Sequence, residues 1–282
     1  MSITRDNLPA DIDVDLIYAR QTQALRQFQT GVWLSTIVLF GLLAITFSGW
    51  QPEAFGYRLK TIQLDWAFIQ ERWQFIAGGV GLTILLSFLS ILLASLLALL
   101  GALGRLSKFA PAYALATFYI SLIRGTPLLL QIIFFFLALP QLGIILTGFT
   151  AGVLALGLNY GAYMTEIFRA GIQSVGIGQR EAALAIGMNQ FQIMRRVILP
   201  QALRLVIPPI GNQFIAMLKD TALISVTGFV HETLWRAQKV GRANFKSLEA
   251  LLIAAIFYWI VTIIFSAIQS RIEAYMSRGD RK

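Results

Sequence analysis

Three ionisable residues, Glu166, Lys219 and Asp220, stand inside stretches of the chain that are otherwise apolar. A charged side chain in hydrocarbon is costly, so such residues usually face a protein interior or a water-filled pathway and take part in function. Glu166 could face the pathway and attract a cationic group of a solute, or it could cap the end of its span and pair with Arg169 or Arg124. Lys219 and Asp220 could lie within the membrane or at the outer end of a span. The sequence leaves these alternatives open.

Neutral polar side chains accompany the charges and could hold a polar solute. Asn159 and Tyr163 precede Glu166 at steps of seven and three residues, so the three share one face of a helix. Asn212 and Gln213 follow two consecutive prolines, which free backbone carbonyls that could line a cavity. The residues predicted to line a substrate pathway are Glu166, Tyr163, Asn159, Gln131, Asn212, Gln213, Lys219 and Asp220.

The composition excludes several kinds of chemistry. The chain has no cysteine and one histidine, His231, so disulfides, thiolate catalysis and Cys/His metal centres are ruled out. No two acidic residues pair within a span, which argues against an intramembrane enzyme. The chain also lacks the G-x-x-x-x-G-K-[ST] loop that cradles nucleotide phosphates. We therefore expect no catalytic site, no metal and no cofactor bound by this chain.

The same composition predicts an all-α polytopic membrane protein. Hydrophobic residues make up 57% of the chain and charged residues 13%, about half the usual charged fraction of a soluble protein. Long uncharged stretches predict about six spans, with a break at Pro140 and Gly143 inside the longest. Segment 112–123 is too short to cross and is expected at the interface or against the bundle. The predicted spans are 30–49, 73–104, the two halves of 125–165, 205–230 and 250–270.

Basic residues predict the orientation of these spans. With both termini in the cytoplasm, the inner segments carry more than twice as many Lys and Arg residues as the outer ones, as is typical of plasma-membrane proteins. Segment 231–247 counts against this orientation because it carries four basic residues. The inner segments are 1–29, 104–124, 169–204 and 271–282, and the outer ones are 50–75 and 231–247.

The polar loop 169–204 has the features of a docking element. Residues 178–187 predict a two-turn helix with Gly187 just past its end, and 189–199 predict a second short helix before Pro200 bends the chain back into the membrane. The loop could dock a partner protein, or it could be an ordinary solvated loop. Separately, Gly78, Gly79 and Gly81 predict close helix packing.

This loop resembles the cytoplasmic EAA loop of permease subunits of binding-protein-dependent ABC importers. The match comprises Glu181-Ala182-Ala183, then Gly187, then a Val197-Ile198-Leu199-Pro200 end, with Val197 replacing the usual isoleucine. It implies that these residues couple the permease to an ATPase. Four further segments resemble the polar amino-acid branch of that family: 124–129, 163–169, 200–204 and 219–223.

The resemblance implies a pore subunit, not an enzyme, that imports polar amino acids across the bacterial plasma membrane; the alternative is another small polar solute. It implies as partners an ATPase dimer that binds ATP and Mg, a second permease (the same chain or a homologue) and an extracytoplasmic solute-binding protein. The expected divisions of the chain are a polar cytoplasmic segment 1–29, an extra N-terminal span and outer loop 30–75, a five-helix permease domain 76–272 containing the coupling loop 171–200, and a basic cytoplasmic tail 273–282.

Overall fold

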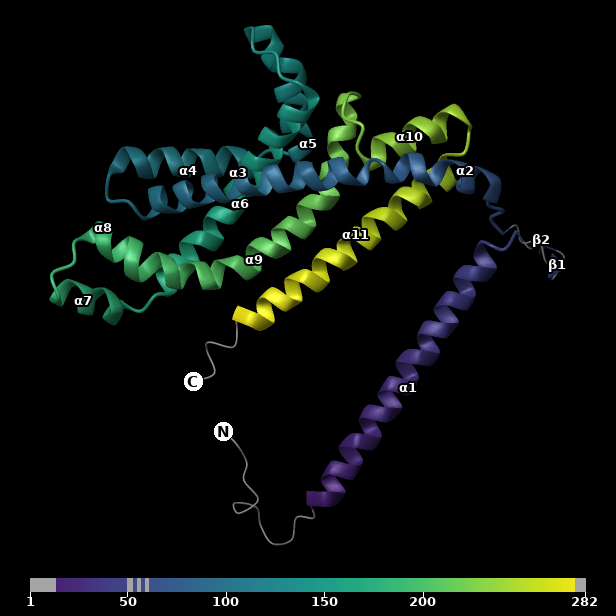
Figure 1. Ribbon diagram of the computed structural model, residues 1–282, viewed down its shortest axis with the longest axis horizontal. Coiled ribbons are helices and arrows are strands. Elements are labelled where there is room, and N and C mark those ends of the chain that lie inside the picture. Colours follow the sequence, from purple (N-terminus) through teal and green to yellow (C-terminus); the bar gives the residue numbers. More distant parts are fainter. Residues whose placement is uncertain (1–13, 50–52, 55–56, 59–60, 277–282) are drawn as a thin grey trace. The chain divides into compact units, whose positions relative to one another are not determined.

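The computed structural model describes residues 14–49, 53–54, 57–58 and 61–276, which divide into two compact units, 1–65 and 66–282 (Figure 1). The first unit contains helix α1 (Val14–Thr46) and a short antiparallel pair, β1 (Glu53–Ala54) with β2 (Tyr57–Arg58). Helix α1 is continuous from residue 14 of the polar N-terminal segment through the first predicted span. Residues 22–46 of α1 are apolar enough to cross a membrane, and their side chains are nearly all exposed within the chain.

The second unit is helical throughout the region that the structure describes. The elements are α2 (Trp66–Ala77), α3 (Val80–Leu106), α4 (Ala110–Arg124), α5 (Leu128–Ile133), the π-helix η2 (Phe134–Ala138), the 3₁₀-helix η3 (Leu139–Leu142), α6 (Gly148–Ser174), α7 (Ile177–Ala185), α8 (Gln190–Ile193), the π-helix η4 (Met194–Ile198), α9 (Leu199–Asp220), the 3₁₀-helix η5 (Thr221–Thr227), α10 (Thr233–Ala243) and α11 (Ser247–Met276).

Small residues hold α3 and α6 together at the centre of this unit. A Cβ atom on Gly101 of α3 would lie 2.5 Å from the Thr165 hydroxyl oxygen, and one on Gly157 of α6 would lie 2.5 Å from a Leu93 methyl carbon. Ala94, Ala98 and Ala102 of α3 are buried. Without large side chains in between, the two backbones approach closely, which is how helices pack inside a membrane.

The predicted short helix 112–123 is present as α4, which packs against α3 and α6. Tyr119 of α4 donates a 2.7 Å hydrogen bond to the Leu158 carbonyl of α6, and a Cβ on Gly104 of α3 would lie 2.8 Å from the Ala116 methyl. The prediction that this helix is tucked against the bundle is confirmed.

A sharp bend separates α4 from α5. It lies at Gly125, where the sequence predicted that a span begins. The axes of 110–124 and 128–142 differ by 103° across Gly125-Thr126-Pro127. Pro127 has no N–H and disfavours a helical conformation at the residue before it, so α4 ends here. Gln131 holds the bend through its Nε2, which donates to the Ile123 carbonyl at 2.8 Å and to the Thr126 hydroxyl at 2.8 Å. The predicted break at Pro140 and Gly143 is confirmed, since Gly143 has φ 80°.

The turn between α2 and α3 brings Gly79 against the start of α10. A Cβ atom on Gly79 would lie 2.6 Å from the Thr233 backbone nitrogen, whereas one on Gly81 would meet nothing within 4 Å. The close packing predicted for the glycine cluster therefore holds at Gly79 and not at Gly81. The side chains of Thr83 and Thr233 add a buried 3.0 Å hydrogen bond between α3 and α10.

A fully buried carboxylate caps α10 beside this contact. Glu232 accepts hydrogen bonds from the backbone N–H groups of Leu234 and Trp235 and from the Tyr258 hydroxyl of α11. Burial raises the pKa of Glu232, while these three donors oppose the rise. Glu232 therefore has a structural role, because it caps α10 and joins that helix to α11.

The polar loop 169–204 contains the predicted helix 178–187 as α7, ended by Gly187 with φ 83°. Asn189 then begins α8 with a capping box formed with Gln192. Pro200 does not end the second predicted helix: the backbone stays helical from α8 through η4 into α9. The wider π-turn of η4 ends two residues before Pro200 and accommodates its ring and missing N–H.

The two prolines at 208 and 209 also lie inside α9 without ending it. The Pro208 carbonyl accepts a 2.7 Å hydrogen bond from Gln269 of α11, and neither proline is among the residues that line the cavity described below.

By length and composition, three helices of the described residues can cross a membrane: Thr22–Thr46, Trp66–Leu106 and Ser247–Met276; the bent pair α4–α5 brings the number to four. α6 and α9 contain 27 and 22 residues but also charged groups, including Glu166 and Asp220. A membrane protein of helices is confirmed, and the number of six spans stays a prediction.

We predict that Gly79→Ala lowers the free energy of unfolding by about 1–3 kcal/mol, because the new methyl group would meet backbone atoms that cannot rotate away. Gly81→Ala is the matched control and should leave stability unchanged or slightly improved. Reversible unfolding of the purified chain in mixed micelles measures both variants. Equal stability of the two would show that α3 does not contact α10 at Gly79.

We predict that Gln131→Leu costs about 1–3 kcal/mol of unfolding free energy, because the change leaves buried polar partners without their hydrogen bonds. Glu166→Gln, which removes a partly exposed ion pair on α6, should cost less than about 1 kcal/mol in the same assay. A smaller loss for Gln131→Leu than for Glu166→Gln would contradict the role of Gln131 in the bend.

Candidate functional site

A cavity of about 560 Å³ lies at the α4–α5 bend, where α6 and α9 also meet. Its volume falls within the range of about 300–1,000 Å³ typical of small-molecule sites. Its walls are made by segments far apart in sequence. The lining residues are Arg124, Gly125, Thr126, Pro127, Leu128, Asn159, Tyr160, Tyr163, Gln213 and Asp220.

Asp220 brings a carboxylate to this cavity from the last residue of α9. Tyr160 of α6 donates a 2.7 Å hydrogen bond to its Oδ2, and no basic side chain of the described residues forms an ion pair with it. A carboxylate that accepts one hydroxyl hydrogen bond keeps capacity for further donors, such as an ammonium group.

Arg124 supplies the positive charge in the lining, from the last residue of α4. Its guanidinium carbon lies 5.1 Å from the centre of the Tyr163 ring, within cation–π range. The guanidinium donors can therefore bind a carboxylate while the aromatic ring orients the side chain. The lining carries one positive and one negative group.

Amide side chains connect the bend to the cavity wall. Asn159 of α6 lines the cavity and donates a 3.2 Å hydrogen bond to Oε1 of Gln131, whose Nε2 holds the bend. Gln131 is buried and lies behind the lining. The position of Asn159 therefore depends on the same hydrogen bonds that set the angle between α4 and α5.

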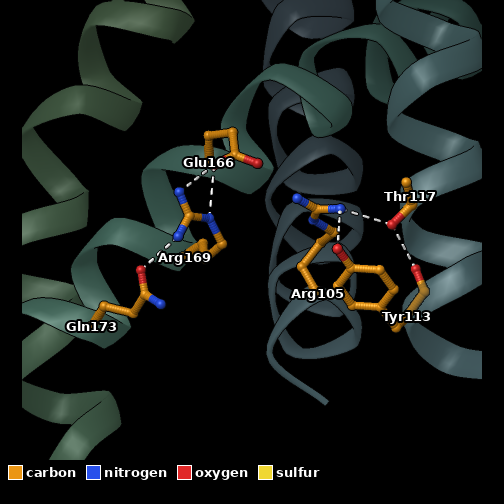
Figure 2. Close-up of polar contacts among 6 residues, drawn as sticks. All are labelled: Arg105, Tyr113, Thr117, Glu166, Arg169 and Gln173. Atoms are coloured by element: carbon orange, nitrogen blue, oxygen red, sulfur yellow. Dashed lines mark hydrogen bonds and ion pairs between the residues drawn. The ribbon is translucent and has the colours of Figure 1, made fainter. Parts of the chain in front are cut away.

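Glu166 forms the predicted pair with Arg169, although it lies inside α6 and does not cap the end of that helix. Arg169 donates to Oε2 of Glu166 from both Nε and Nη2 at 2.7 Å, and Nη1 of Arg169 also donates to Gln173 (Figure 2). Figure 2 also shows Arg105 of α3 held by Tyr113 and Thr117 of α4. Glu166 is not among the residues that line the cavity.

The structure thus brings together only some of the predicted set. Asn159, Tyr163, Gln213 and Asp220 line the cavity, and Gln131 supports it. Asn212 and Lys219 are exposed on α9 and lie outside the lining, as does Glu166.

Of the lining residues absent from the predicted pathway, Tyr160 and Arg124 make the side-chain contacts described above. Tyr160 carried no separate signal, because its partner Asp220 is 60 positions away. The sequence favoured Arg124 as a cytoplasmic anchor over a ligand, and also offered it as a partner of Glu166. Its position next to a proline-ended helix could have suggested a cavity.

The residues of the predicted coupling loop form an exposed unit. Glu181 and Ala182 are exposed on α7, whereas Ala183 is 4% exposed and packs into the core. Leu199 and Pro200 begin α9. The loop also exposes several large apolar side chains, which is unusual for a loop that contacts only solvent. They are Ile177, Leu184, Ile186 and Phe191.

The sequence and the fold match one family of membrane transport components. Residues 90–278 match the family described as binding-protein-dependent transport system inner membrane component. The chain is 42% identical to the L-cystine transport system permease protein TcyB of Bacillus subtilis, over 76% of this chain and 92% of that protein. It is 37% identical to the glutamine transport system permease protein GlnP of Escherichia coli K12, over 76% and 99%.

Solved structures agree. A crystal structure of an amino acid ABC transporter with histidines superimposes with a TM-score of 0.70 at 38% identity, covering 76% of this chain and all of that one. The MetNI methionine ABC transporter, at 18% identity and a TM-score of 0.57, shows the same fold. The chain therefore belongs to the family of inner membrane components of binding-protein-dependent transport systems.

Proposed function

We propose that this chain is the permease subunit of an ABC importer for polar amino acids, and that the cavity at the α4–α5 bend is its amino-acid site. The observation that carries the proposal is a lining with one cation, Arg124, and one carboxylate, Asp220, inside a member of this transporter family. The relatives that transport cystine and glutamine by name support an amino acid as the solute.

The chemistry of the lining matches the portion that all amino acids share. A zwitterion carries one ammonium and one carboxylate, which Asp220 and Arg124 complement with no net charge left over. Asn159 and Gln213 add neutral donors and acceptors for a polar side chain. A small polar solute without a zwitterion is the alternative, and it would leave at least one of the two charges unpaired.

Transport would be driven through the exposed face of α7. In this proposal, an ATPase dimer that binds ATP and Mg docks on the coupling residues Glu181, Ala182, Ala183, Gly187, Leu199 and Pro200. Ala183 and Ile193 pack against the core, which would let a push on α7 reach α6 and α9 as a rigid-body movement. The chain itself would do no chemistry.

The remaining partners and the topology complete the proposal. A second permease, either the same chain or a homologue, would complete the pathway, and an extracytoplasmic solute-binding protein would deliver the solute. Both termini would face the cytoplasm of a multi-pass plasma-membrane protein. Exposed apolar side chains on 128–142, such as Leu130, Phe134 and Leu137, support a further protein or lipid contact there.

We predict that Asp220→Asn raises the KM for uptake of the transported amino acid at least tenfold, because a charge-assisted hydrogen bond to its ammonium group is lost. Lys219→Gln, a neighbouring charge outside the cavity, is the matched control and should leave KM unchanged. Uptake into proteoliposomes containing the full complex measures both. An unchanged KM in Asp220→Asn would remove the cavity from the pathway.

We also predict that Glu181→Lys abolishes uptake and lowers ATPase co-purification at least tenfold, with a normal level of permease in the membrane. Gln179→Lys places the same new charge about 200° away around α7 and should preserve both. If Glu181→Lys retains uptake and ATPase binding, α7 is not the docking helix.

A further inference from the structure

A second cavity, of about 570 Å³, lies between η5 and α10, away from the amino-acid site. Two basic residues, Lys239 and Arg242, line it from successive turns of α10, and no acidic residue is among its lining. The neutral lining includes the hydroxyl of Ser225 and the amide of Gln238. The remaining lining residues are Val226, Gly228 and Trp235.

These two cations have no counter-charge within the described region of the chain. Among the residues that the structure describes, neither Lys239 nor Arg242 has a carboxylate within ion-pair distance, and both side chains are exposed. Lys239 instead lies 4.9 Å from the centre of the Trp235 ring, whose indole N–H donates to the Gly228 carbonyl at 2.9 Å. Arg236 of the same helix differs, because it donates to the carbonyls of His231 and Phe75.

Exposed apolar side chains lie within the lining, at Val226, and next to it in sequence: Phe229 follows the lining residue Gly228, and the Phe245 N–H donates a 3.4 Å hydrogen bond to the Arg242 carbonyl. Phe229 is 74% exposed, Val226 is 52% exposed, and Phe245 is 95% exposed in the turn that joins α10 to α11. Phe245 has φ 56°, a conformation uncommon for a bulky residue. The turn is held by a 2.9 Å hydrogen bond from the Lys246 N–H to the Gly241 carbonyl. It presents an aromatic side chain outward at the start of α11.

The residues of α10 and the turn after it directly precede α11, and this position indicates what surrounds them. α11 is apolar enough to cross a membrane, and most of its side chains are exposed within the chain, so its first residue, Ser247, lies near a lipid–water boundary. Tryptophan, lysine and arginine gather at that boundary. Phe229 contacts the ring of Phe136, with ring centres 5.7 Å apart, whereas an acidic soluble protein would match the cations but would leave the exposed Phe245 without an apolar partner.

We propose that this cavity binds the phosphate of an anionic phospholipid, with Lys239 and Arg242 on the phosphate and Phe229 and Phe245 against the glycerol and upper acyl chains. Ser225 and Gln238 would hydrogen-bond the phosphate or glycerol oxygens. The site would anchor α10 and η5 to the membrane surface. It does not depend on which solute the chain transports.

Lipid titration of the full-length purified chain by native mass spectrometry tests the proposal, with phosphatidylglycerol and phosphatidylcholine as probes. We expect tighter binding of phosphatidylglycerol, a loss of about fivefold for Lys239→Gln or Arg242→Gln, and a larger loss for the double variant. Arg195→Gln with Arg196→Gln removes two exposed cations elsewhere and should change nothing. Unchanged phosphatidylglycerol binding in the Lys239/Arg242 double variant overturns the proposal.

Two further arms separate lipid from other anions. Phe245→Ser should weaken phosphatidylglycerol binding, and glycerol 1-phosphate, which lacks acyl chains, should compete poorly. If glycerol 1-phosphate binds as tightly as the lipid and Phe245→Ser has no effect, the site holds a soluble phosphate and the lipid assignment is wrong. If the double variant keeps lipid binding but loses stimulation by the solute-binding protein, an acidic protein surface occupies the cavity instead.

Discussion

The close approach of α3 to α6 is the constraint on which the rest of the helical unit depends. Gly101 and Gly157 allow it, because a side chain at either position would collide with Thr165 or Leu93. Once these two helices are in contact, α4 packs across both, and α9 packs against α6 and α3. The polar residues of α6 then have a fixed direction, so Asn159 and Tyr160 meet the bend on one side and the end of α9 on the other.

The cavity exists because three helix ends converge on this frame. α4 ends at Arg124, α5 begins after Pro127, and α9 ends at Asp220. Helix ends expose polar groups that a membrane interior otherwise disfavours, and such broken helices are tolerated where they line a polar cavity. The same end of α4 provides the cation, and the end of α9 provides the carboxylate. This separation of charges lets one cavity complement both ends of a zwitterion.

Local patterns in the sequence predicted the membrane class, the helices of the polar loop 169–204, the helix end at Gly187 and the glycine contact at Gly79. Long-range contacts could not be predicted in this way: the Tyr160–Asp220 hydrogen bond joins α6 to α9, and nothing near Tyr160 announces that partner. The prediction that a helix ends before Pro200 failed because a proline usually breaks a helix, whereas here the π-turn before it accommodates the proline. Only some residues of the predicted pathway reached the cavity, because helical period alone does not say which face a neighbour covers.

The most direct test of the account is ATP-driven accumulation of radiolabelled polar amino acids by proteoliposomes that contain this chain, its ATPase and its solute-binding protein. A permease that moves only when another subunit hydrolyses ATP should accumulate solute with ATP and the ATPase present, and should accumulate none when the ATPase is left out. Accumulation against a gradient by the permease without any ATPase would contradict the account.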